Sequence, residues 1–306
     1  MKITIPSYSK NYNLSPIKSE KDANKFGLSF GKHDDCDYCL YWGLATTNLH
    51  VHKKYGVMET GFFNEASFID TIGSYQCCSL NTRFAYEQIS NFDLEGRKSA
   101  KEIINTLAPN KRSKFNPVFG VNEPFEQNVV LACQNQYDRA IGYPSSTSKY
   151  FEFIELCCKY YGKNLFVKLH PWNSGENTKP YFEIAKKYNC GIGKCHMSLI
   201  KNKDFVISFN STIAIDCILN DVPYAQYETG TFWNCFGITY TNQTFPSFVE
   251  KIPGAEKLLD FLIYKYCFNK TMPIDKYAKM IKHYASSNDI FPMNDEFCYA
   301  NNISGE

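Results

Sequence analysis

Residues 204–237 read DFVISFNSTIAIDCILNDVPYAQYETGTFWNCFG and change character along their length. The apolar run at 205–207 has the length of a buried strand. Apolar residues then recur at helical spacing between residues 213 and 218, and residues 222–225 resume as a further strand. This order predicts strand, tight loop, helix and strand, which is typical of an α/β domain.

The loop between the predicted strand and helix is built from small polar residues, namely Ser208, Asn210, Ser211 and Thr212. These residue types cap helices. In an open α/β sheet they also lie beside the crevice beyond the carboxyl ends of the strands, where helix amides can receive an anion. The loop by itself is compatible with an ordinary helix cap or with an anion site.

A second apolar strand is predicted at 164–169, and Lys168 and His170 lie at its end, directly before Pro171. A residue that precedes a proline is pushed into an extended conformation, so we expect the imidazole of His170 at the same crevice edge. Single histidines are mostly structural. Together with the hydroxyl-rich loop, however, this lysine and histidine indicate a phosphate site.

Several motifs in a fixed order resemble the donor-binding half of capsule-polysaccharide (Kdo transferase-like) GT-B glycosyltransferases, and more closely the small tailed-phage relatives of that family. The motifs are Gln134-x-x-x-Asp138, Lys168-x-His170-Pro171 and Ser208-x-Asn210-Ser211-Thr212-x-x-x-Asp216, followed by Asp221-Val222-Pro223. The resemblance covers residues 55–240, approximately. It implies an α/β fold of two Rossmann-like domains facing a cleft, with a C-terminal helix that crosses back to the first domain.

The length of 306 residues suits two domains. We expect an acceptor-binding domain at 1–122, a nucleotide-sugar-binding domain at 123–270, and a C-terminal helix and tail at 271–306 that pack on the first domain. The predicted donor-binding residues are Gln134, Arg139, Lys168, His170, Ser208, Asn210, Ser211, Thr212 and Glu228.

Within that set, the resemblance places Glu228 where a carboxylate takes the ribose hydroxyls of the donor. Trp233 and Phe236 either pack on the nucleobase or close the core. Because Lys168, His170 and the loop amides can offset the diphosphate charge, we expect no metal ion and no cofactor besides the nucleotide-sugar co-substrate.

A predicted strand at 55–60 carries Glu59 at its carboxyl end, where α/β folds place reactive groups. A half-buried carboxylate can act as the general base toward an acceptor hydroxyl. Glu59 is the first candidate for this base and Asp70 the second, and the alternative for Glu59 is a structural carboxylate. The capsule transferases read Glu-Asp-Gly-Phe at this point. Here Thr60 replaces the Asp, so the catalytic role assigned to that Asp does not carry over.

The composition indicates a folded protein, with 44% hydrophobic and 16% aromatic residues and a net charge of +2. No apolar run reaches the ~18 residues of a membrane span, and no signal peptide is evident, so we expect a cytoplasmic protein. The 13 cysteines are expected to be reduced. A zinc site formed by Cys36, Cys39, Cys190 and Cys195 is disfavoured, because the two pairs fall in different predicted domains.

Basic residues gather between residues 97 and 114, where they form either a solvated surface or a contact to a phosphate backbone. Aromatic residues that follow Glu59 are candidates for stacking on an unstacked base. The predicted acceptor-binding residues are Phe62, Phe63, Arg97, Lys98, Lys111 and Arg112.

The sequence therefore predicts a metal-independent glycosyltransferase that moves a sugar from a nucleotide-sugar, preferably a UDP-sugar, to an acceptor hydroxyl. The favoured acceptor is a 5-hydroxymethylated pyrimidine, such as hydroxymethylcytosine, in double-stranded bacteriophage DNA. One alternative is Kdo-type transfer from a CMP-sugar to a surface glycan. The other is a catalytically silent module that binds a nucleotide or a glycan.

Overall fold

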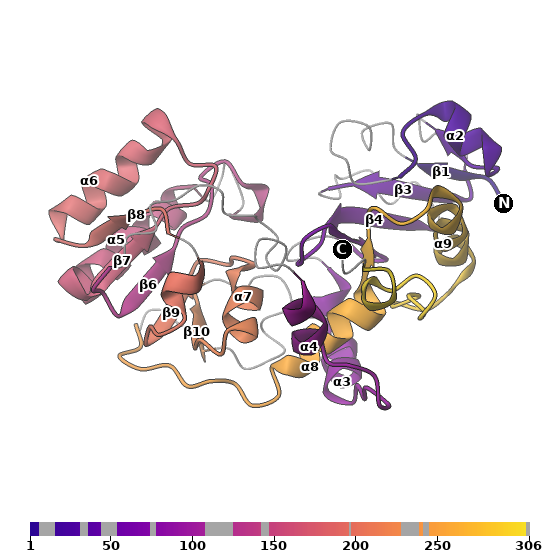
Figure 1. The fold of residues 1–306 in the computed structure, drawn as a ribbon. Coiled ribbons are helices and arrows are strands. Elements are labelled where there is room, and N and C mark those ends of the chain that lie inside the picture. The colour runs from indigo at the N-terminus through magenta and orange to yellow at the C-terminus, as the bar shows by residue number, and fades with distance from the viewer. Residues whose placement is uncertain are drawn as a thin grey trace. The chain divides into compact units, whose positions relative to one another are not determined.

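The computed structural model describes residues 1–5, 16–30, 36–43, 54–73, 78–107, 125–141, 147–195, 197–227, 239–240 and 245–303. The chain forms two compact units. Unit 1 consists of Met1–Lys114 together with Glu256–Glu306, and unit 2 is Phe115–Ala255. Each unit contains its own β-sheet with helices packed around it (Figure 1).

Unit 1 has a six-stranded mixed sheet in the order β12-β5-β4-β3-β1-β2. Strands β1 to β4 pair in parallel, whereas β5 pairs antiparallel with both β4 and β12. The strands are β1 (Ile3–Ile5), β2 (Ser29–Phe30), β3 (Tyr38–Trp42), β4 (Tyr55–Thr60), β5 (Ala66–Asp70) and β12 (Cys267–Asn269).

The helices of unit 1 come from both ends of the chain. They are α2 (Glu20–Lys25), α3 (Arg83–Ser90), α4 (Ala100–Thr106), α8 (Glu256–Phe261), which continues into a π-helical turn (Leu262–Tyr266), and α9 (Ile274–Ser286). Ser99 and Glu102 start α4 with a reciprocal capping box. The Tyr277 hydroxyl in α9 donates to the Met58 sulfur in β4 at 3.3 Å, so α9 contacts the sheet.

Unit 2 has a six-stranded sheet in the order β11-β10-β9-β6-β7-β8, and all of its pairings are parallel. The strands are β6 (Val129–Ala132), β7 (Leu165–Lys168), β8 (Gly191–Gly193), β9 (Phe205–Ser208), β10 (Tyr224–Gln226) and β11 (Thr239–Tyr240). The helices are α5 (Thr147–Tyr161), α6 (Lys179–Lys187) and α7 (Ile213–Leu219).

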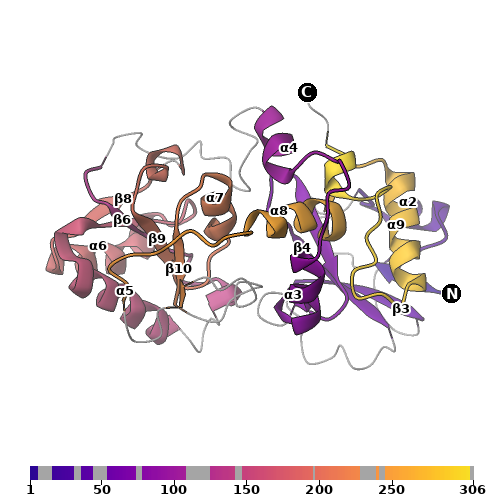
Figure 2. The ribbon, with the colours of Figure 1, turned by 90° about the horizontal axis from the view of Figure 1, so that it is seen from below.

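A hydrophobic core lies between one face of this sheet and helices α5 and α6. Strand residues at alternate positions enter that core, for example Leu131, Val167 and Ile207. Helix α7 lies on the other side of the sheet (Figures 1 and 2). Because successive side chains of a strand point to opposite faces, Lys168 and Ser208 point to the face that α7 covers.

The chain returns to unit 1 earlier than the sequence suggests. Residues 256–270 were expected in the second domain, but α8 packs on α3 and α4 of unit 1. In addition, β12 pairs with β5, with Phe268 opposite Ser67. The packing of this segment therefore assigns it to the first unit.

Candidate functional site

The strand order in the sheet of unit 2 reverses between β6 and β9. From β6 the chain adds β7 and β8 on one side, and then β9, β10 and β11 on the other. Such a topological switch point opens a crevice between the loops that follow the two central strands, and ligands of open α/β sheets bind there. The loops that follow β6 and β9 therefore border the expected ligand crevice.

Gln134 and Asn210 join these two loops directly. The Gln134 side-chain amide donates to Asn210 Oδ1 at 2.8 Å, and the Asn210 backbone N–H donates to Gln134 Oε1 at 3.2 Å. Asn210 Nδ2 also donates to the Ala140 carbonyl at 2.7 Å. Both side chains are buried. These two predicted donor-binding residues thus hold the loops together at the switch point.

The last residues of the central strands form one row across the sheet. Gln226 pairs with Ser208, Ser208 with Ala132, and Ala132 with Lys168. Since the strands are parallel, the row lies along their carboxyl edge, and its side chains share the face of α7. The register places Lys168 and Ser208 at the same edge with one strand between them.

Lys168 is a mostly buried lysine, and no described residue provides a counter-ion for it. Its relative exposure is 9 %, and within the described part of the chain its Nζ has no hydrogen-bond or ion-pair partner. Burial raises the pKa of the thiols of Cys133, Cys195 and Cys217, and the positive charge of Lys168 acts on all three in the opposite direction. These cysteines belong to the end of β6, the segment after β8, and α7, so the lysine charge lies among these elements.

His170 lies at the same edge, two residues beyond Lys168. Its Nδ1 accepts a hydrogen bond from the Trp172 backbone N–H at 3.2 Å, so the proton of the neutral ring resides on Nε2. The His170 carbonyl accepts from the Asn173 N–H at 2.9 Å, and Asn173 Nδ2 donates to the Gln134 carbonyl at 3.4 Å. A chain of hydrogen bonds therefore links the loop of His170 to the loop of Gln134.

Asn173 was not among the residues predicted from the sequence. It is 1 % exposed, and its Oδ1 has no hydrogen-bond partner among the described residues. Buried polar atoms are seldom left in this state. The sequence signal that could have identified it is its place in the His-Pro-Trp-Asn run directly after a strand.

The loop that starts α7 uses most of its hydroxyls internally. Ser208 Oγ lies 2.6 Å from the Tyr224 hydroxyl and accepts the Ser211 N–H at 3.0 Å, while Ser211 Oγ accepts the Ile213 N–H at 3.2 Å. Thr212 is the N-cap, but its side chain makes no capping bond. Ser208 is fully buried and shapes the loop, and Ser211 and Thr212 are partly exposed.

Some predicted residues lie outside the described part. Glu228, Trp233, Phe236, Lys111 and Arg112 are in undescribed segments. The backbone of Arg139 belongs to a short 3-10 turn, Arg139–Ile141, but its side chain is not described.

In unit 1, Glu59 and Asp70 differ in their surroundings. Glu59 is half-buried near the end of β4, and its Oε1 accepts the Thr60 N–H at 2.7 Å. Asp70 ends β5 and is 1 % exposed. The donors to its carboxylate are the Ile72, Gly73 and Ser79 amides and the Ser79 and Tyr266 hydroxyls, at 2.6–2.8 Å. This geometry is that of a structural carboxylate, because its oxygens are already engaged.

Phe62 and Phe63 belong to the core of unit 1, which differs from the expected stacking role. Phe62 is 6 % exposed and stacks on Phe68 with ring centroids 5.4 Å apart. Phe63 is 1 % exposed and stacks on Tyr299 at 5.6 Å. Since neither ring presents a face to solvent, a stacking role for them would require the core to open.

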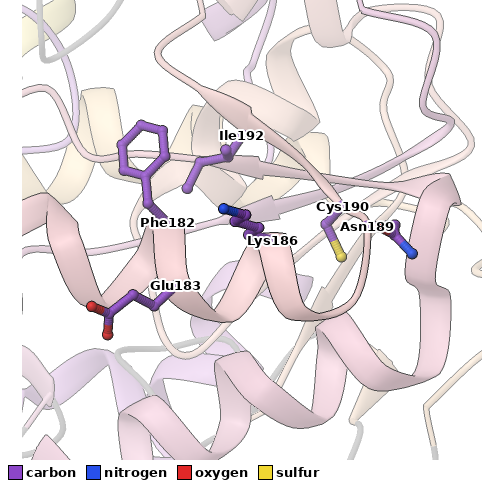
Figure 3. A pocket seen from close by; sticks show the side chains of 6 residues that line it. All are labelled: Phe182, Glu183, Lys186, Asn189, Cys190 and Ile192. Carbon is purple, nitrogen blue, oxygen red and sulfur yellow. The ribbon is translucent and has the colours of Figure 1, made fainter.

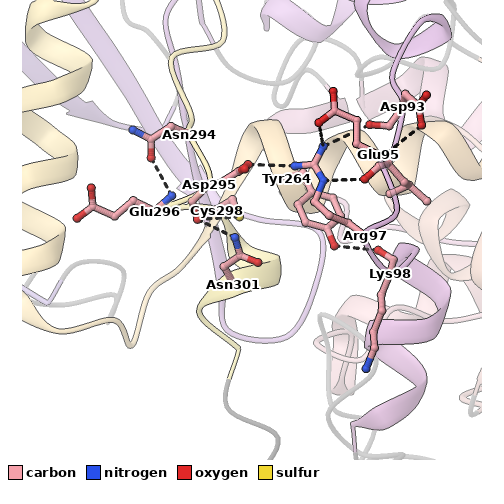
Figure 4. A network of polar contacts seen from close by, with 11 residues as sticks. Asp93, Glu95, Arg97, Lys98, Tyr264, Asn294, Asp295, Glu296, Cys298 and Asn301 are labelled. Atoms are coloured by element: carbon pink, nitrogen blue, oxygen red, sulfur yellow. Dashed lines mark hydrogen bonds and ion pairs between the residues drawn. The ribbon is translucent and has the colours of Figure 1, made fainter.

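Arg97, another predicted acceptor residue, is held inside a polar network (Figure 4). Its guanidinium bonds Asp295 at 3.1 Å and the Leu94 carbonyl at 2.9 Å, and it lies over the Tyr264 ring at 4.6 Å. The neighbouring Lys98 is exposed, and its ammonium group points away from this network (Figure 4). Arg97 therefore anchors the segment before α4 to the C-terminal part of the chain.

A hollow of about 520 Å³ lies on α6 and β8 of unit 2 (Figure 3). Its lining is Phe182, Glu183, Lys186, Asn189, Cys190 and Ile192. It includes none of the predicted site residues, and its two charged side chains have opposite signs.

Metal ligands do not cluster in the described part, where no group of three or more His, Cys, Asp or Glu side chains is placed to hold an ion. Asp35-Cys36-Asp37 matches an Asp-x-Asp pattern, but Asp35 is not described and Asp37 binds the Lys2 backbone N–H at 2.6 Å. No described helix has both the length and the apolar character that a membrane crossing requires.

No protein-family model and no curated protein matches the sequence. Solved structures do match. One is the "KpsC, beta Kdo 2,7 transferase" of Thermosulfurimonas dismutans, with a TM-score of 0.59 and 17% identity, over 88% of this chain and 92% of that one. Another is the "KpsC, beta Kdo 2,4 transferase" of the same organism, with a TM-score of 0.52 and 12% identity, over 94% and 98%.

At these identities the likeness shows the fold. The chain has the two-sheet α/β fold of these GT-B glycosyltransferases, which confirms the predicted fold class. The match extends over most of the length of both proteins, so it includes both units.

Proposed function

We propose that this protein is a glycosyltransferase that uses a nucleotide-sugar, and that the carboxyl edge of the sheet in unit 2 holds the phosphate of this donor. The fold supports the reaction class, since both structures named above are transferases by their titles. Fold alone does not define an activity, so the proposal depends on the residues at that edge.

The observation that carries the proposal is Lys168. The Lys168 side chain is mostly buried, and no described residue neutralises its charge, so a bound anion can supply the missing partner. A phosphate or diphosphate oxygen bound to Nζ would form a charge-assisted hydrogen bond. His170, with its proton on Nε2, would donate a second bond to the same group.

Gln134 and Asn210 have a positioning role in this proposal. Because they bind each other across the switch point, they hold the loops at a fixed separation before the ligand arrives. A preformed site avoids the cost of ordering its loops on binding. The lysine, histidine and loop geometry together can stabilise a departing nucleotide without a metal ion.

Glu59 is the proposed general base for the acceptor hydroxyl. It is half-buried next to the end of β4, and the Thr60 amide donates to its Oε1, which orients the carboxylate for accepting a proton. The full exchange breaks the bond between the anomeric carbon and the donor phosphate and forms one to the acceptor oxygen. The acceptor proton goes to Glu59, and the nucleotide leaves with the negative charge.

The acceptor remains a prediction. Transfer from a UDP-sugar to hydroxymethylated pyrimidines in DNA is the version favoured by the sequence, although the burial of Phe62 and Phe63 gives it no support. The second candidate is Kdo-type transfer from a CMP-sugar to a glycan. It is favoured by the titles of both similar structures.

A turnover assay separates these versions. The full-length protein is incubated with UDP-glucose, UDP-N-acetylglucosamine or CMP-Kdo, each with hydroxymethylcytosine DNA, unmodified DNA or a Kdo-terminated glycan, and nucleotide release is measured. Release of UDP only with hydroxymethylated DNA supports the DNA version, and release of CMP only with the glycan supports the Kdo version. If none of these nucleotide-sugars binds or reacts, the proposed function is wrong.

A further inference from the structure

Trp172 is an exposed tryptophan directly beside the proposed phosphate site. Its relative exposure is 67 %, although tryptophan is among the largest apolar side chains. It follows Pro171 and lies two residues from His170. The rings of His170 and Trp172 meet at 75° with centroids 5.6 Å apart, so they do not stack face to face.

The loop that carries Trp172 is held from several sides. The Trp172 N–H donates to His170 Nδ1 at 3.2 Å, and the next residue, Asn173, donates to the carbonyls of His170 and Gln134. Lys194, which follows β8, donates from Nζ to the Pro171 carbonyl at 2.9 Å. The indole is therefore presented to solvent by a fixed backbone, which is the arrangement that a preorganised contact residue needs.

A second exposed aromatic ring lies on the adjoining loop. Tyr137 follows β6 and is 51 % exposed, and its hydroxyl lies 3.4 Å from Asn177 Oδ1 in the loop of Trp172. Two exposed aromatic side chains thus come from neighbouring loops at the edge that carries Lys168. Aromatic faces beside a cation suit a ligand that joins a flat ring to a phosphate.

We propose that Trp172 stacks on the base of the nucleotide whose phosphate is held by Lys168 and His170, with Tyr137 flanking the same base. This inference rests on the proposed function and adds the residue that recognises the nucleoside part of the donor. Stacking on an indole tolerates every base, because each base has a π-face. Trp172 therefore contributes affinity for the nucleoside without choosing between uracil and cytosine.

The test compares nucleotides with a phosphate probe that lacks a base. The dissociation constants of UDP and CMP are measured by calorimetry for the wild type, Trp172→Ala and Trp172→Phe, and pyrophosphate is measured by its displacement of UDP. Phe248→Ala is the matched control, since Phe248 is also in unit 2 and is 70 % exposed. Thermal unfolding of each variant checks that it is folded.

Loss of one stacking contact predicts that Trp172→Ala weakens UDP and CMP roughly 5- to 150-fold. Trp172→Phe should retain most of the affinity, and Phe248→Ala should leave it unchanged. Pyrophosphate should bind the wild type and Trp172→Ala equally. An unchanged affinity of Trp172→Ala for UDP and CMP overturns the inference, and so does an equal loss for pyrophosphate.

The failure of this inference is distinguishable from failure of the proposed function. If the wild type binds neither nucleotide, both are wrong. If the wild type and Trp172→Ala bind UDP and CMP equally well, only the stacking role is wrong. Tryptophan fluorescence gives a second readout: UDP should quench the wild type more than Trp172→Phe, and equal quenching contradicts the inference.

Discussion

Lys168 lies where no residue of the described part neutralises its charge. It ends β7, points to the face of α7, and has three buried cysteines within electrostatic range. None of these thiols is a counter-ion, because burial raises their pKa values and keeps them neutral. Such a residue lowers the stability of the free protein and is expected to gain a partner on ligand binding.

Replacing Lys168 by methionine should therefore have opposite effects on stability and binding. The Lys168→Met variant keeps the side-chain length and removes the charge, so its free energy of unfolding should rise by about 1 kcal/mol. Its affinity for UDP or CMP should fall roughly 10- to 100-fold, as expected for the loss of a charged hydrogen bond. Denaturant unfolding and calorimetry measure the two effects.

Lys203→Met is the control for this substitution. Lys203 is also in unit 2, but its Nζ donates to the Phe125 carbonyl at 2.7 Å and lies 4.2 Å from the centre of the Phe125 ring. Removing it should lower stability and leave nucleotide affinity unchanged. A Lys168→Met protein that is less stable than wild type and binds nucleotide normally would identify Lys168 as a structural residue.

Glu59 and Asp70 have similar positions in the sequence but different surroundings in the fold. Both were candidates for the base, and in the structure Glu59 is the next-to-last residue of β4 while Asp70 is the last residue of β5. The bond from the Tyr266 hydroxyl to Asp70 joins residues 196 positions apart, so no local pattern could have revealed it. The same limit applies to Phe62 and Phe63, because the sequence around an aromatic residue after a glycine does not show whether its ring is exposed or buried.

The Glu59→Gln substitution tests the proposed base. Glutamine keeps the oxygen that accepts the Thr60 N–H, so the loop should stay in place. Without a group to accept the proton, kcat should fall at least ~100-fold while the dissociation constant of the nucleotide stays the same. Steady-state kinetics and calorimetry give both values. The account of Glu59 fails if the variant turns over at the wild-type rate, or if it loses nucleotide affinity.

The strand–loop–helix unit from β9 to α7 was predictable, because the hydrophobic period changes from that of a strand to that of a helix. The Asn220-Asp221 pair is typical of a helix end, and in the structure α7 ends at Leu219 and Asp221 has a φ of 58°. In contrast, the sequence of residues 254–267 is typical of one helix. They form α8 and a π-helical turn before β12, and β12 is a three-residue strand buried along its whole length, with no alternation to reveal it.

Helices α8 and α4 are joined by a buried carboxylate. Asp260 in α8 accepts a hydrogen bond from the Ala100 N–H, at the start of α4, at 2.6 Å. Burial raises the pKa of Asp260, and Glu256 and Glu102 act in the same direction, whereas the Ala100 N–H lowers it. The folded state therefore binds this proton more tightly than the unfolded state does.

This shift predicts a pH dependence with a defined sign. A carboxyl whose folded pKa lies above its unfolded value of about 3.9 makes folding less favourable at neutral pH, and this effect is relieved as the pH falls through the folded pKa. Asp260→Asn keeps the acceptor for Ala100 and cannot ionise. The variant should be more stable than wild type at pH 7, with an advantage that shrinks towards pH 4.

Denaturant unfolding of both proteins between pH 4 and pH 8 measures this difference. Asp204→Asn serves as the control, since Asp204 is exposed on unit 2. An advantage of Asp260→Asn that stays constant or grows as the pH falls would contradict the assignment of the raised pKa to Asp260.

The chain as a whole combines two α/β units, each with a six-stranded sheet. The two-unit fold was predicted from motif order and length, and the solved structures agree with it over most of the chain. The exact return point at Glu256 could not be predicted, because it depends on how α8 and β12 pack on unit 1. The placement of candidate residues was easier to predict in unit 2, where Gln134, Lys168, His170 and Asn210 all lie at one sheet edge.

The central claim is that this edge receives the phosphate of a nucleotide. Its most direct test is a crystal structure of the full-length protein with UDP or CMP bound. The account predicts phosphate oxygens within hydrogen-bonding distance of Lys168 Nζ and His170 Nε2, beyond the carboxyl ends of β6 and β7. A nucleotide bound elsewhere, with Lys168 still without a partner, would contradict it.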